Sequence, residues 1–223
     1  MRLHYNHNPI KAGFTLIELS IVLVVIGLIV GGVMVGKDLI NASTIRSQIS
    51  QIEKYNTSIN TFRLKYGALP GDMKNADAVA FGFATRGTGT GDGDNNGILE
   101  ASHTSCGITN GLYNMGYGET LMFWADLSSA QLIDGNFSTA NWTSSATTDQ
   151  KKYLPLAKIS SAGYVYVYHD GGATISKNHF GINPIDVIDP SSGCIYYNNP
   201  SSHRAISVVQ AYNIDKKIDD GFP

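Results

Sequence analysis

The sequence predicts an α+β protein in which a long N-terminal α-helix, half membrane segment and half amphipathic, packs on a C-terminal antiparallel-sheet head with extra short helices. Two observations predict the helix: residues 14–36 are almost entirely apolar, and residues 45–66 carry one apolar seam at helical spacing. The head is indicated by short runs rich in β-branched and aromatic residues, such as 164–168, separated by Gly, Ser and Asn.

Residues 14–36 contain a single charge, Glu18. A helix of this length covers about 34 Å, enough for a hydrocarbon core of about 30 Å. A buried core helix is the alternative, but such helices rarely stay apolar on every face for so long. Arg2 and Lys11 precede the run with no acid beside them. The positive-inside rule therefore puts the N-terminus in the cytoplasm and residues 37–223 outside.

Processing is expected before the apolar run rather than after it. A secretory signal peptide has its small-residue cleavage site after the apolar stretch. Here the small-residue pair Ala12-Gly13 comes first, and no Ala-x-Ala pattern follows at a suitable distance. The apolar segment is therefore expected to survive processing.

The stretch KAGFTLIE at residues 11–18, followed by an apolar helix, resembles the class III signal of type IV prepilins and type II secretion pseudopilins. The resemblance implies a pilin-like fold and cleavage by prepilin peptidase between Gly13 and Phe14, with Lys11 in the recognition sequence. It also implies N-methylation of Phe14. In the filament, Glu18 of an incoming subunit is expected to neutralise the Phe14 amine of its neighbour and set the axial register.

The resemblance also implies partners and a location. The partners are prepilin peptidase, an inner-membrane assembly platform, other pilin or pseudopilin subunits, and the membrane itself. The subunit is expected to be a single-pass protein of the bacterial inner membrane with a periplasmic head, and then to enter a pilus or pseudopilus, at the cell surface in the case of a pilus. The chain lacks the proline that many relatives carry late in the apolar segment and has glycines there instead. These glycines either soften the helix or let helices pack closely.

Four segments follow from this organisation: a cleaved leader at 1–13, a membrane and filament-core helix at 14–36, its amphipathic continuation at 37–66, and a head at 67–223. The amphipathic seam consists of Ile45, Ile49, Ile52, Tyr55, Ile59, Phe62 and Tyr66. A coiled-coil stalk is the alternative, although about three heptads are few for one. The order of motifs in the head looks like that of a group of large bacterial pilin-like proteins, which usually continue further, so truncation at Pro223 is an expectation too.

Within the head, the sequence predicts short elements joined by polar loops. Leu69-Pro70-Gly71-Asp72 is predicted to be a turn, and residues 84–97 and 136–152 are predicted to be loops. Helices are predicted at 119–133 and 204–217, and strands at 164–168, 173–182 and 194–197.

Residues 92–98, DGDNNGI, fit the first half of a calcium loop, D-x-[DN]-x-[DN]-G, in which alternate oxygens converge because glycine permits a sharp turn. The twelfth position holds His103 rather than Glu, so Glu100 or Glu119 is expected to supply the missing carboxylate. A solvated turn is the alternative, since Asp, Asn and Gly dominate turns. The predicted calcium ligands are Asp92, Asp94, Asn96, Ile98 through its carbonyl, and Glu100.

Cys106 and Cys194 are the only cysteines. Because both are expected outside the cytoplasm, a disulfide is the default, and it would add about 4 kcal/mol of stability on the chain-entropy model. Two unpaired buried thiols are the alternative.

The sequence predicts no enzyme. It contains no H-E-x-x-H metal motif, no G-x-S-x-G elbow after a strand and no phosphate loop ending in G-K-[ST]. A net charge of −2 and a pI near 6.3 argue against a nucleic-acid footprint. The predicted function is a structural subunit of a type IV pilus or type II secretion pseudopilus. The alternative is a single-span, membrane-anchored extracytoplasmic sensor or ligand-binding protein.

Overall fold

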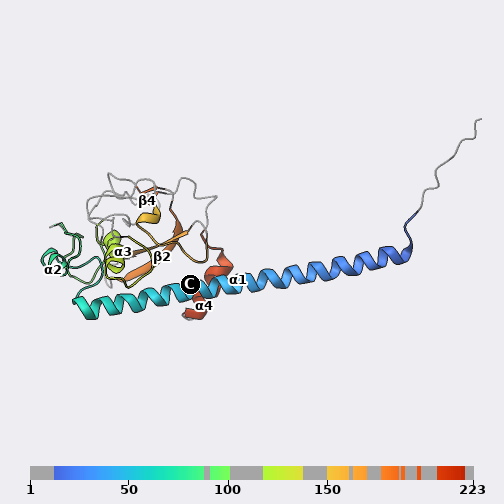
Figure 1. Ribbon diagram of the computed structural model, residues 1–223, viewed down its shortest axis with the longest axis horizontal. Coiled ribbons are helices and arrows are strands. Elements are labelled where there is room, and N and C mark those ends of the chain that lie inside the picture. Colours follow the sequence, from blue (N-terminus) through green and yellow to red (C-terminus); the bar gives the residue numbers. More distant parts are fainter. Residues whose placement is uncertain are drawn as a thin grey trace, which may run out of the picture. The chain divides into compact units, whose positions relative to one another are not determined.

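The computed structural model describes residues 13–87, 91–100, 118–137, 150–160, 163–169, 177–185 and 205–218, and the backbone at 187–188 and 195–196. The chain divides into two compact units, Met1–Ser43 and Thr44–Pro223, so the second half of the first helix belongs to the unit that holds the head. The four segments predicted above, bounded at 13, 36 and 66, stay predictions. The elements (Figure 1) are α1 (Leu16–Tyr66), α2 (Asn75–Ala80), α3 (Glu119–Ser129), η1 (Gln150–Lys152), β1 (Gly163–His169), β2 (Asn178–Pro184), β3 (Val187–Ile188), β4 (Ile195–Tyr196) and α4 (Val208–Ile218).

A long N-terminal helix, a two-stranded antiparallel sheet and short helices fit the pilin-like α+β layout. The predicted amphipathic seam is confirmed, because its residues from Ile45 to Tyr66 are buried or half-buried in the second unit. The seam also holds two buried polar residues, Gln48 and Ser58. The Gln48 Oε1 accepts a hydrogen bond from the backbone N–H of Ile159 at 3.1 Å, and the Ser58 hydroxyl donates to the carbonyl of Leu132 at 2.8 Å. These bonds fasten α1 to loops of the head.

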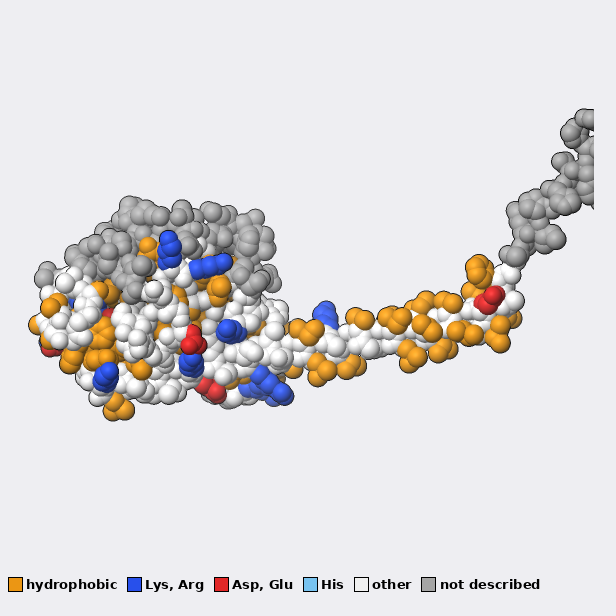
Figure 2. Space-filling view, in the orientation of Figure 1, with side chains coloured by type: hydrophobic (Ala, Val, Ile, Leu, Met, Phe, Trp, Pro, Cys, Tyr) orange, Lys and Arg blue, Asp and Glu red, His pale blue; other side chains and the backbone are white. Residues whose placement is uncertain are grey.

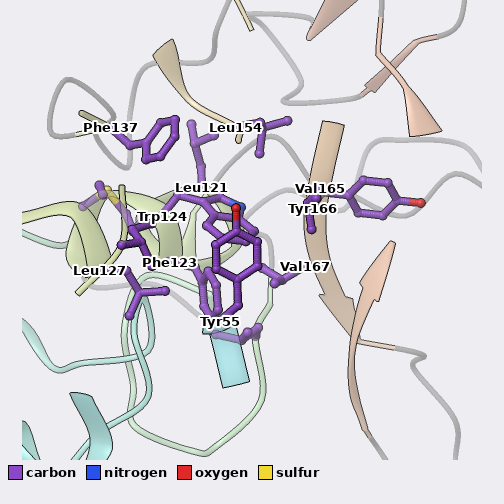
Figure 3. Packing of buried hydrophobic residues seen from close by; sticks show 14 of the residues in the cluster. Tyr55, Leu121, Phe123, Trp124, Leu127, Phe137, Leu154, Val165, Tyr166 and Val167 are labelled. Atoms are coloured by element: carbon purple, nitrogen blue, oxygen red, sulfur yellow. The ribbon is translucent and has the colours of Figure 1, made fainter. Parts of the chain in front are cut away.

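The core of the head centres on α3, whose residues 119–127 are all buried. Trp124 packs edge-on against Tyr55 of α1, with ring centroids 4.9 Å apart (Figure 3). Helix α3 ends before the predicted residue 133, since Gln131 takes a left-handed backbone conformation with φ of 58°. A non-glycine residue in that conformation ends a right-handed helix.

The sheet of the head pairs β1 with β2 in antiparallel register. The predicted strand at 164–168 is confirmed as β1. Tyr166 lies opposite Gly181, and its ring occupies the space where a Cβ on Gly181 would lie 2.1 Å from the Tyr166 Cζ. Glycine at position 181 therefore leaves room for the tyrosine ring on this face of the sheet.

The remaining elements agree with the predictions to different degrees. β2 overlaps the predicted strand 173–182 and extends two residues beyond it, and residues 173–176 of that prediction lie outside the described residues. β4 falls within the predicted strand 194–197 and pairs with β3, which was not predicted. α4 starts later than the predicted residue 204 and ends one residue beyond 217, while α2 and η1 are further unpredicted elements.

A buried ion pair fixes the predicted turn at 69–72 against α3. The Arg86 Nη2 lies 2.5 Å from the Asp126 Oδ1, and both side chains are about 1% exposed. The other carboxylate oxygen of Asp126 accepts the N–H of Gly71 at 2.7 Å. Gly71 has φ of +86°, and a Cβ there would lie 2.2 Å from the carbonyl oxygen of Glu119, so only glycine fits this close approach. The turn thereby brings Asp72 to the start of α3.

Candidate functional site

The first turn of α1 is closed by reciprocal hydrogen bonds between Thr15 and Glu18. The Glu18 Oε2 accepts the backbone N–H of Thr15 at 2.7 Å and its hydroxyl at 2.8 Å. In return, the Thr15 Oγ1 accepts the N–H of Glu18 at 3.3 Å. This is a capping box, in which the residue before the helix and the third helical residue satisfy each other's free amide groups. The helix therefore starts at Leu16, and Gly13 to Thr15 stay outside it.

The capping box gives Glu18 a role within its own chain. A free helix N-terminus has amide donors without partners, and those in a hydrocarbon environment are costly. Glu18 satisfies one of these donors with one carboxylate oxygen. Among the described residues its other oxygen, Oε1, accepts no hydrogen bond.

Sequence reasoning missed Thr15, although its signal was present. Thr15-x-x-Glu18 immediately before an apolar run is the sequence signature of a capping box. Both predicted processing residues next to it, Gly13 and Phe14, lie in non-helical backbone. The third, Lys11, lies outside the described residues.

The apolar part of α1 is exposed throughout. Its large side chains from Leu16 to Ile40 range from 48% exposed at Val25 to 86% at Leu16, and Phe14 just before the helix is 85% exposed. Figure 2 shows hydrophobic side chains along this part of the helix. The helix is long and apolar enough to cross a membrane. So large an exposed apolar surface marks a membrane or protein contact, since monomers rarely expose patches above a few hundred Å².

In the head, three carboxylates from separate segments converge: Asp72 from the turn at 69–72, Asp94 from the predicted calcium loop, and Glu119 from the start of α3. One oxygen of each lies within 4.8 Å of the others. Asp72 and Glu119 are buried, whereas Asp94 is exposed. Hard cations such as Ca²⁺ bind oxygen donors of this kind.

Two of these carboxylates hold the loop at residues 93–100 in place. The oxygens of Glu119 accept the N–H groups of Gly93 and Glu100, both at 2.8 Å. The oxygens of Asp72 accept the N–H of Gly97 at 2.8 Å and that of Asn96 at 3.3 Å. The loop is thus fastened through its backbone.

Burial is the largest influence on the pKa values of Glu119 and Asp72. It raises the pKa of Glu119 to about 8, although the hydrogen bonds from Glu100 and Gly93 oppose it. It likewise raises the pKa of Asp72 to about 6, against the hydrogen bonds from Gly97 and Asn95. Desolvation penalises a charged carboxylate, and the neighbouring acids add repulsion. A bound cation would favour the ionised forms instead.

The structure brings together only part of the predicted calcium ligand set. Of the five predicted residues, Asp94 alone belongs to the cluster of three acids. The side-chain oxygen of Asn96 accepts the N–H of Ile98 at 2.7 Å, and its amide nitrogen donates to Asp94 at 3.0 Å and to Glu100 at 3.4 Å. Asp92 is buried, 6% exposed. Glu119, considered from sequence as a substitute ligand, lies in the cluster.

Asp72 was missed because only folding brings it to the loop. It precedes Asp94 by 22 positions, and its turn is positioned by the distant Asp126. The predicted disulfide residues Cys106 and Cys194 lie outside the described residues.

Comparison with known families supports the reading of the N-terminus. Residues 9–34 match the prokaryotic N-terminal methylation motif. The N-terminus is a prepilin-type class III signal. Comparisons with curated proteins and with solved structures gave no match. The prepilin-type signal and the apolar helix together support membrane anchoring of the chain, and they point to a structural subunit rather than an enzyme.

Proposed function

We propose that this chain is a structural subunit of a type IV pilus or type II secretion pseudopilus. Prepilin peptidase cuts between Gly13 and Phe14, Phe14 is N-methylated, and the subunits polymerise through α1 with the help of an inner-membrane assembly platform. One observation carries the proposal: a match to the methylation motif covers the start of a helix whose apolar side chains are exposed on every side. Other subunits would cover that surface in a filament.

The geometry around Thr15 supports processing at this position. Cleavage after Gly13 leaves the peptide bond between Phe14 and Thr15 intact, so the N–H of Thr15 still reaches Glu18 and the capping box survives. The new amine on Phe14 would sit one residue before the cap. The Glu18 oxygen outside the capping box is then the acceptor for a neighbour's Phe14 amine, which gives the predicted register between subunits.

Electron microscopy of cells that overproduce the chain tests this function. Filaments that label with antibody against the head are expected, and their loss on replacement of Gly13 by Val ties them to processing. Absence of filaments in cells that cleave the chain normally would overturn polymerisation. In the rival class, a membrane-anchored sensor, the chain would keep its leader and form no filament.

Calcium at the head is a second proposal, with the predicted donors Asp92, Asp94, Asn96, the carbonyl of Ile98, and Glu100. It is supported by the convergence of Asp94 with Asp72 and Glu119, which extends the predicted donor set with two carboxylates. The calcium would hold the loop at 93–100 against α3. A disulfide between Cys106 and Cys194 is likewise a proposal, tested by the mass of the protein before and after reduction.

A further inference from the structure

Helix α4 exposes apolar side chains on its outer side. Val208 is 77% exposed, Val209 68% and Tyr212 50%, and none of the residues of this helix is buried. At 100° per residue, these three positions and Lys216 fall within one arc of about 100°. The Lys216 Nζ lies 5.9 Å from the centroid of the Tyr212 ring. These four residues are called the α4 outer face below.

The opposite side of α4 is the partly covered one. Gln210, Ala211 and Ile214 lie there and are half-buried, whereas Ile218, on the same side in the last turn, is 55% exposed. A surface helix normally turns its apolar stripe inward and its polar side to solvent. In α4 two valines and a tyrosine are exposed, and packing against the described part of the head does not account for them.

The helix does not depend on burial for its start. The side-chain oxygen of Gln210 accepts the N–H of Ser207 at 2.9 Å, and the Ser207 hydroxyl oxygen accepts the N–H of Gln210 at 3.3 Å. This is a second capping box in the chain. It fixes the first turn of α4 and so holds Val208 and Val209 in position.

The head is tethered close to a membrane by the anchoring already inferred, on which this inference rests. Only residues 37–43 separate the apolar run from the unit that begins at Thr44. These seven residues belong to α1, where at 1.5 Å per residue they span about 10 Å. The lipid surface is therefore present at a high effective concentration, so a weak contact suffices.

We propose that the α4 outer face lies on the phospholipid surface while the subunit is held in the membrane. An interfacial helix places aliphatic and aromatic side chains at the boundary of headgroups and acyl chains, and its lysines reach the phosphates. Val208, Val209 and Tyr212 supply the first part, and Lys216 with the adjacent Lys217 supplies the second. Since Asp215 and the following Asp219 and Asp220 offset these charges, apolar contact dominates and the lysines orient the helix.

The test uses the full-length chain in nanodiscs of equimolar phosphatidylcholine and phosphatidylglycerol, at one chain per disc. Val209→Trp places a reporter in the outer face, and Leu64→Trp places a control at a side chain that is 89% exposed on α1. The signal of the native tryptophans is subtracted. Brominated acyl chains are expected to quench the reporter at 209 about twofold or more, and not the control. Adding Val208→Asp and Tyr212→Asp should abolish that quenching.

Each other outcome is decisive. Equal quenching at 209 and 64 overturns the proposal. If the chain then still co-purifies with the discs, the inferred membrane anchor remains supported. A chain that does not insert into the discs overturns the anchor and this proposal together. If the tryptophan at 209 is shielded from solvent only in discs that hold two chains, a second copy covers the α4 outer face. That result also overturns a lipid contact.

Discussion

The carboxylate of Glu18 accepts both the backbone N–H and the hydroxyl of Thr15, at 2.7 and 2.8 Å. The sequence predicts that Glu18, an acid in a membrane segment, pairs with the Phe14 amine, both within its own chain after cleavage and on a neighbouring subunit in the filament. In the structure it already caps its own helix with one oxygen. Its two roles, cap and docking charge, predict different results for different substitutions.

Replacing Thr15 by Ala removes the hydroxyl from the capping box. Loss of an N-cap costs about 1 kcal/mol, which corresponds to about fivefold faster opening of the first turn. Hydrogen exchange of the amides at residues 15–19 in micelles measures it. Ser20→Ala is the matched control, because the Ser20 hydroxyl bonds the carbonyl of Ile17 and caps nothing. Unchanged hydrogen exchange in Thr15→Ala would show that the Thr15 hydroxyl does not cap α1.

Replacing Glu18 by Gln separates the cap from the charge. A capping box accepts Gln at this position, so the helix start is retained while the negative charge is lost. Cleavage by prepilin peptidase is expected to stay normal and filament yield to fall strongly, as counted by electron microscopy. Glu18→Ala should lose both the cap and the charge. Normal filaments from Glu18→Gln would show that the charge does not dock subunits.

The stability of the head is expected to fall as the pH rises from about 4.5 to 8 without divalent cations. Glu119, with its pKa raised to about 8, keeps a proton in the folded state that the unfolded chain has already released. Folding therefore takes up protons in this window, and each pKa unit is worth about 1.4 kcal/mol, so the loss is on the order of 5 kcal/mol. Asp72, with its pKa raised to about 6, adds to the loss below pH 6.

Urea unfolding in chelator at pH 5 and pH 8.5, followed by tryptophan fluorescence, measures this slope. Glu119→Gln is neutral at both pH values, so most of the slope should disappear in that variant. A loss in Glu119→Gln as large as in the unaltered chain would contradict the assignment to Glu119.

Calcium is expected to reverse that slope, because a cation favours the ionised carboxylates. At pH 8 the melting temperature of the processed protein in micelles should drop when chelator is added, and it should drop less at pH 5, where protons compete. Asp94→Asn should weaken the response, since Asp94 belongs to both the predicted ligand set and the observed cluster. A melting temperature that chelator leaves unchanged at both pH values would dismiss calcium.

Local patterns predicted the elements whose signals lie within one stretch of sequence. The seam from Ile45 to Tyr66 and strand β1 were of this kind, because helical and strand periodicities are read directly. The end of α3 was missed because it depends on the left-handed conformation of Gln131. A glutamine in the sequence does not indicate that conformation. Strand β3 was missed because its two residues are too few to carry a period.

The same distinction between local and distant signals applies to the residues of the candidate site. Gly13, Phe14 and Glu18 belong to one contiguous motif, so sequence alone suffices to predict them as processing and assembly residues. Asp72 was not, because it reaches Gly97 only after Asp126 and Arg86 have positioned the turn that carries it. Contacts between segments that are distant in sequence have no local signature.

Intact-protein mass spectrometry of the chain, extracted from membranes that contain prepilin peptidase, shows whether the N-terminus is processed as a prepilin. The expected mass lacks residues 1–13 and includes one added methyl group on Phe14, whereas Gly13→Val is expected to keep the full leader. An unaltered chain that retains its Met1 terminus in those membranes would contradict the prepilin account.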